Sequence, residues 1–155
     1  MARRVFFSFH YDRDIWRANQ VRNCNVVTGA DTAGFFDHSE YEEAKKKGSD
    51  GIKRMILNNL KNTSVTVVLI GTETASRPWV QYEIRESIVR KNGLLGIYIH
   101  HLKDQDGKAS IFRGSKPAVP EGIELPAYDW DKDLDRFRKA IEGAGKRSDA
   151  MLKAY

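Results

Sequence analysis

Two residues of this 155-residue chain, Trp79 and Glu83, have types and spacing suited to a reactive cleft. They lie in residues 76–84 (S-R-P-W-V-Q-Y-E-I), and a spacing of four places both on one face of a helix. That helix follows an apolar strand, residues 65–70, and open α/β sheets bind ligands just past the carboxyl ends of their strands. A carboxylate in a partly dry aromatic cleft can stabilise an oxocarbenium-like sugar as a glycosidic bond breaks. Because Glu83 lies early in its helix, we expect it to be ionised at neutral pH.

Side chains near the end of the first strand are candidates for the opposite wall of this cleft. After Arg4, Ser8 is the one polar residue of residues 4–9 (R-V-F-F-S-F), which indicates that it faces a cleft or satisfies backbone groups. Phe6 lies on the same face of the strand as Ser8, because alternate residues of a strand point to the same side. Its ring either forms the floor of the pocket or packs in the core. Phe9 and His10 follow on the adjoining loop, where they can stack on a ring or form hydrogen bonds.

Two further residues are candidates for substrate binding, although each could equally have a purely structural role. Asp37 ends a short second strand, residues 33–37, where it either binds a ribose or caps the next segment. Trp79 either stacks on a ligand ring or packs between helix and sheet. The expected site therefore consists of Glu83 as the catalytic residue and six substrate-binding residues: Phe6, Ser8, Phe9, His10, Asp37 and Trp79.

Alternating strands and helices predict an α/β fold. We expect strands at residues 4–9, 33–37, 65–70 and 94–99 and a short edge strand within 125–130. Helical periodicity predicts four helices: one that starts at residue 12 or 14 and ends at about 23, and three at residues 49–60, 77–91 and 131–141. The charged residues 40–47 fit either a helix or a loop. This pattern indicates a flavodoxin-like, doubly wound, mostly parallel five-stranded sheet of order 2-1-3-4-5 with helices on both faces. Residues 1–142 would form one domain, and 143–155 a tail that frays or adds a turn of helix.

Composition and missing motifs exclude several classes of function. The net charge of +5 is spread among interleaved acids, so we expect no nucleic acid partner. No apolar run approaches 18 residues and no signal peptide is evident, so we expect no membrane association. A single cysteine, Cys24, suits the cytoplasm. The four histidines lack metal-binding spacing, and Rossmann, Walker and flavin phosphate motifs are missing, so we expect neither a metal nor a cofactor.

At these residues the sequence resembles the TIR domains, and more closely the TIR-like family that includes the signal-producing component of the Thoeris antiphage system. Residues 4–9 resemble the first sequence motif of the family. G-F-F-D at 34–37 resembles the family's second strand, which ends in an acidic residue. W-V-Q-Y-E-I at 79–84 resembles the box that holds the catalytic glutamate. With the helix of Ile52, Ile56 and Leu60 and the N-T-S before the third strand, the resemblance covers about residues 4–99.

The resemblance implies an NAD+ glycohydrolase or cyclase. NAD+ would be the substrate, cleaved at the nicotinamide-ribosyl bond to give ADP-ribose or a cyclic ADP-ribose-type signal, with Glu83 contacting the ribose. It also implies self-association on activation and a separate effector that answers the diffusible signal. Two alternatives stay open: a non-catalytic TIR-like interaction module, and an enzyme like the nucleoside 2-deoxyribosyltransferases, which share the sheet and use a glutamate nucleophile.

Overall fold

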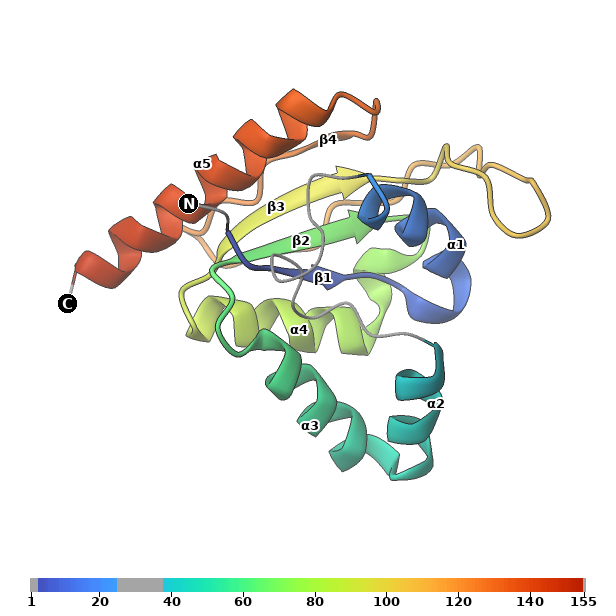
Figure 1. Ribbon diagram of the computed structural model, residues 1–155, viewed down its shortest axis with the longest axis horizontal. Coiled ribbons are helices and arrows are strands. Elements are labelled where there is room, and N and C mark those ends of the chain that lie inside the picture. Colours follow the sequence, from blue (N-terminus) through green and yellow to red (C-terminus); the bar gives the residue numbers. More distant parts are fainter. Residues whose placement is uncertain (1–2, 25–37, 155) are drawn as a thin grey trace.

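A parallel four-stranded sheet forms the centre of the computed structural model, which describes residues 3–24 and 38–154 (Figure 1). Its strands are β1 (Val5–Ser8), β2 (Val65–Ile70), β3 (Gly93–Tyr98) and β4 (Ala127–Asp129), hydrogen-bonded in that order. The expected α/β class and the relative order of these strands are confirmed. The expected strand at residues 33–37 lies outside the described residues, so the five-stranded order stays a prediction.

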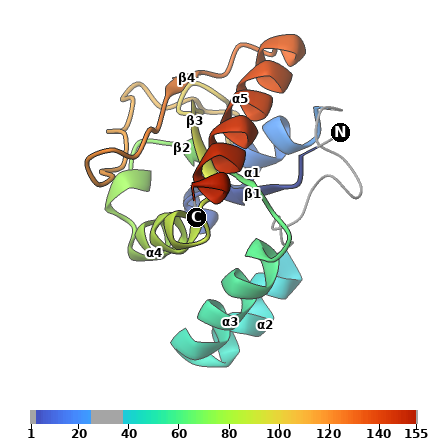
Figure 2. The ribbon, with the colours of Figure 1, turned by 90° about the vertical axis from the view of Figure 1, so that its left-hand side faces the viewer.

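Helices cover both faces of the sheet, which explains why β1, β2 and β3 are buried along their whole length. The helices are α1 (Tyr11–Arg22), α2 (His38–Lys46), α3 (Gly48–Leu60), α4 (Pro78–Val89) and α5 (Leu134–Lys153), and the short 3-10 helix η2 (Thr74–Ser76) precedes α4. Figure 2 shows α1 and α5 on one side of the sheet and α3 and α4 on the other. Residues 40–47, which fit either a helix or a loop, mostly belong to α2.

Strand alternation divides the core into two layers. Phe7 and Val67 of the sheet pack with Val21 of α1 and Phe137 of α5. On the opposite face, Phe6 packs against α3, while Val68 and Ile70 pack against α4. The sheet therefore holds the carboxyl end of β1 and the first turns of α4 in fixed positions, and the candidate site lies between them. None of the helices in the described part of the chain is long and apolar enough to cross a membrane.

The last helix is longer than expected. Instead of ending near residue 141, α5 continues to Lys153 and buries Ala144 and Ser148. A Cβ on Gly145 would lie 2.4 Å from Nε of Arg3, whose guanidinium forms ion pairs with Glu142 and Asp149 at 2.9 Å. The glycine therefore gives the arginine room to join the N-terminal segment to α5, rather than ending the helix.

Candidate functional site

A buried serine and a buried carboxyl group meet at the centre of the site. Ser8 ends β1, and its hydroxyl donates a hydrogen bond of 2.7 Å to Oε1 of Glu83 in the second turn of α4. Ser8 is fully buried and Glu83 is 4% exposed. No cation is paired with Glu83 in the described part of the chain, so this hydroxyl supplies its side-chain hydrogen bond. The contact joins two residues 75 positions apart that the sequence placed at the same sheet edge.

A small cleft of about 40 Å³ opens beside the Glu83 carboxyl group. Three parts of the chain form its walls: the segment from the end of β1 into α1, one face of α3, and the first turns of α4. The lining residues are Phe9, His10, Tyr11, Asp12, Ile52, Met55, Ile56, Arg77, Trp79, Val80 and Glu83. This cleft combines an apolar floor with two carboxyl groups, one imidazole and one guanidinium at its walls. Drug-sized ligands occupy pockets of roughly 300–1,000 Å³, so a dinucleotide requires the cleft to widen.

Burial sets the protonation state of Glu83. Desolvation raises the pKa of Glu83 from 4.5 to about 8, and the hydrogen bond from Ser8 opposes part of this rise. The carboxyl group is therefore largely neutral at pH 7 in the ligand-free protein. The expectation of an ionised Glu83 was wrong, because the favourable field of a helix start falls off within the first turn and Glu83 is the sixth residue of α4.

The structure brings together most of the substrate-binding residues expected from the sequence. Phe9, His10 and Trp79 line the cleft with Glu83, and Ser8 contacts the carboxyl group directly. Phe6 is instead fully buried in the core, where it packs behind the α3 wall and does not itself line the cleft. Asp37 lies outside the described residues.

Aromatic rings line two walls of the cleft, Phe9 and Tyr11 from the segment after β1 and Trp79 from α4. Phe9 and Tyr11 stack with centroids 5.9 Å apart, and Trp79 meets Tyr82 edge to face at 5.8 Å. His10 caps the start of α1, and burial followed by the nearby charge of Arg77 lowers its pKa. The imidazole is therefore neutral at pH 7. These rings form a surface on which a pyridinium or purine ring can stack.

Sequence analysis missed Arg77 and the contribution of α3. Arg77 is exposed at the N-cap of α4, lines the cleft, and pairs with no carboxylate among the described residues. Its place directly before Pro78 was the available signal, since the residue at a helix start can meet an anion there. Ile52, Met55 and Ile56 were assigned only to helical packing, and no local pattern distinguishes a cleft wall from a core stripe.

Comparison with known proteins gives a consistent result. The family model described as "Thoeris protein ThsB, TIR-like domain" matches residues 6–104, which include most of β1, the cleft and β3. The chain is also 44% identical to a protein of Bacillus cereus (strain MSX-D12) named "Putative cyclic ADP-D-ribose synthase ThsB1". That similarity covers 89% of this chain and 80% of the Bacillus protein.

Proposed function

The chain belongs to the TIR-like family of Thoeris ThsB proteins, and on this premise we propose that it cleaves NAD+ to make a cyclic ADP-ribose-type signal. The Ser8–Glu83 contact at the floor of an aromatic cleft carries the proposal. A buried carboxyl group with a single neutral hydrogen-bond partner can respond strongly to an approaching positive charge. Nicotinamide released from NAD+ by the purified protein, measured by chromatography, tests the proposal.

The proposed reaction breaks the bond between C1 of the ribose and the nicotinamide nitrogen. The bonding electrons pass to the pyridinium ring, which leaves as neutral nicotinamide, and positive charge develops on the ribose. When the cationic substrate enters, its charge favours the ionised form of Glu83, and the proton passes to solvent. The carboxylate then stabilises the oxocarbenium-like ribose in a site of low dielectric constant. A nucleophile of the same molecule closes the ring, or water gives linear ADP-ribose; either nucleophile releases one proton.

The narrow cleft supports an enzyme that is activated by a change in shape. At about 40 Å³ it cannot hold a dinucleotide, so we propose low basal turnover that rises when copies of the chain associate. The diffusible product would act on a separate effector as part of antiphage defence. The lone Cys24, which forms no disulfide, supports a cytoplasmic location.

Replacing Ser8 tests whether the hydroxyl tunes the carboxyl group. The hydrogen bond lowers the pKa of Glu83, so Ser8→Ala is expected to raise that pKa further above 8. Catalysis by the carboxylate requires deprotonation, so the rising limb of kcat/KM against pH is expected to move to higher pH. Ser87→Ala is the matched control, because this buried hydroxyl donates to the backbone carbonyl of Glu83 and not to its carboxyl group. Equal displacement of both profiles would contradict the assigned role.

Removing the Arg77 guanidinium tests recognition of the substrate diphosphate. Arginine binds phosphate through charge-assisted hydrogen bonds, so Arg77→Ala is expected to raise KM for NAD+ by about tenfold or more with little change in kcat. Steady-state kinetics on nicotinamide riboside, which lacks the diphosphate, is expected to show little difference between this variant and the wild type. Arg85→Ala serves as the control, because Arg85 is exposed on α4 outside the cleft. Equal losses on both substrates would refute a diphosphate contact.

A further inference from the structure

The imidazole of His10 is not used to hold the fold together. His10 occupies the N-cap position of α1, where a side chain commonly accepts a hydrogen bond from the backbone of the first turn. Its ring makes no such bond, and neither ring nitrogen is hydrogen-bonded or ion-paired within residues 3–24 and 38–154. The half-buried imidazole instead lines the cleft together with Glu83. Both of its nitrogens are therefore available to a bound ligand.

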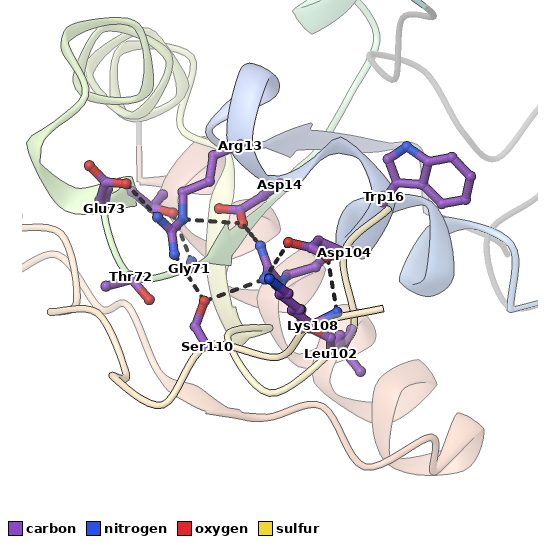
Figure 3. A network of polar contacts seen from close by, with 12 residues as sticks. Arg13, Asp14, Trp16, Gly71, Thr72, Glu73, Leu102, Asp104, Lys108 and Ser110 are labelled. Atoms are coloured by element: carbon purple, nitrogen blue, oxygen red, sulfur yellow. Dashed lines mark hydrogen bonds and ion pairs between the residues drawn. The ribbon is translucent and has the colours of Figure 1, made fainter. Parts of the chain in front are cut away.

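The backbone that carries His10 is firmly held. Its carbonyl oxygen accepts a hydrogen bond of 2.8 Å from the N–H of Asp14. Asp14 is fully buried and accepts a second bond of 2.8 Å, on its carboxyl group, from the guanidinium of Arg17 (Figure 3). The guanidinium of Arg17 also donates to two carbonyl oxygens of the loop between β3 and β4, those of Leu102 at 2.8 Å and Lys108 at 3.1 Å. A group fixed in this way can be aimed at one atom of a substrate.

A second arginine joins the same turn of α1 to the segment that leads into α4. Arg13 donates to the hydroxyl of Ser110 at 2.9 Å and also to the carboxylate of Glu73 (Figure 3). Glu73 directly precedes η2, and η2 leads into α4. The two parts of the chain that carry His10 and Glu83 are thus joined by this bridge as well as by the sheet.

The surroundings of His10 keep its ring neutral. Burial, followed by the charge of Arg77, lowers the pKa of His10. Three acidic side chains oppose part of this shift: Asp14, Asp12 and Glu73. A neutral imidazole carries a lone pair on one of its nitrogens, so it can take up a proton.

The proposed reaction requires a proton acceptor in addition to Glu83. The nucleophile that bonds to C1 of the ribose releases one proton, whether it belongs to the same molecule or is water. Glu83 has to stay ionised while positive charge remains on the ribose, so it is not free to take this proton as the new bond forms. Two other side chains of the cleft can accept a proton at pH 7, His10 and the exposed Asp12. General-base catalysis is most efficient when the base titrates near the working pH, which favours the imidazole.

We propose that His10 is a second catalytic residue, which accepts the proton of the nucleophile as that nucleophile bonds to the ribose. This inference rests on the proposed function and assigns a residue to its second step. A lone pair of the nucleophile forms the bond to C1, and the electrons of its bond to hydrogen stay on the attacking atom. The proton moves to a ring nitrogen of His10, which then releases it to solvent. Glu83 thus assists the departure of nicotinamide, and His10 assists the capture of the ribose.

A nucleophile that has no proton to lose tests this role. His10→Gln keeps a polar side chain that cannot take up a proton at pH 7, and it is expected to lower nicotinamide release from NAD+ by about a hundredfold or more. Azide is already an anion at neutral pH, so its attack on the ribose needs no base. Sodium azide is therefore expected to restore most of the rate to this variant, with ADP-ribosyl azide as the product detected by mass spectrometry. Azide would not rescue a variant whose site is merely distorted.

Two further variants serve as controls at the same protein concentration. His101→Gln makes the same change at an exposed histidine that does not line the cleft, so it is expected to react like the wild type with and without azide. Glu83→Gln is expected to stay slow in azide, because the bond to nicotinamide does not break readily without the carboxylate. Thermal unfolding confirms that each variant is folded.

The possible outcomes separate this inference from the proposed function. Wild-type turnover by His10→Gln, or a slow and folded His10→Gln that azide does not rescue, would overturn the role of His10. Azide rescue of Asp12→Asn in place of His10→Gln would also overturn it and would assign the proton to Asp12. In each of these cases the wild type still cleaves NAD+, so the proposed function stands. If the wild type leaves NAD+ intact with and without azide, the proposed function fails and this inference falls with it.

Discussion

Glu83→Gln is expected to lower the rate of nicotinamide release from NAD+ by about a thousandfold or more. Glutamine keeps the size of the side chain and an oxygen that can accept the hydrogen bond from Ser8, so the cleft is expected to keep its shape. It cannot carry the negative charge that stabilises the oxocarbenium-like ribose. The loss is therefore expected mainly in kcat, with a smaller change in KM.

A second glutamate on the same helix provides the control for this measurement. Glu86 lies one turn further along α4 and does not line the cleft, so Glu86→Gln is expected to retain nearly full turnover. Both variants are assayed at the same protein concentration, so that association does not differ between them. Full activity of Glu83→Gln would show that the reaction does not depend on this carboxylate.

Stability is expected to fall as pH rises, because of the same carboxyl group. The pKa of Glu83 is about 8 in the folded protein and has an ordinary value of 4.5, so the folded state holds this proton more tightly than the unfolded chain. The resulting stabilisation is fully present below the ordinary pKa of 4.5, and it is lost as pH rises through the folded-state pKa of about 8. The total change in the free energy of unfolding is on the order of 4 kcal/mol. The whole free energy of unfolding of a typical domain is only about 5–15 kcal/mol.

Denaturant unfolding of wild type and Glu83→Gln at about pH 5 and about pH 9 checks this expectation. Glutamine does not titrate, so the variant is expected to match the wild type at the lower pH and to exceed its stability at the higher pH. Other titrating groups, such as Asp14, change both proteins alike and cancel in the comparison. Parallel pH profiles for the two proteins would show that burial of Glu83 does not perturb its ionisation.

The sequence was most informative where a residue's position follows from fold topology. Ser8 ends the first buried strand and Glu83 follows another, and parallel strands bring their carboxyl ends to one edge of the sheet. That rule was sufficient to predict that the two side chains would be neighbours. The edge strand β4 was likewise marked by its apolar residues and by the loop before it.

Features that depend on three-dimensional packing were not predictable in the same way. The neutral state of Glu83 follows from complete burial without a cation, which helix position alone does not reveal. We expected the residues from 143 onward to fray or to add only a turn of helix, whereas Gly145 provides room for Arg3 from the other end of the chain and α5 continues to Lys153. The place of Arg77 at a helix start suggests an anion contact, but that it lines a cleft follows only when α3 and the start of α1 are placed opposite it.

The most direct test of the central claim is mass spectrometry of NAD+ incubated with concentrated protein in water enriched in oxygen-18. Cleavage at the Glu83 site is expected to yield nicotinamide together with an unlabelled cyclic ADP-ribose-type product, since ring closure takes its nucleophile from the same molecule. Linear ADP-ribose carrying the label would show hydrolysis at the same bond. Intact NAD+ with a folded, self-associated protein, or equal cleavage by Glu83→Gln, would contradict the claim that this carboxyl group drives the reaction.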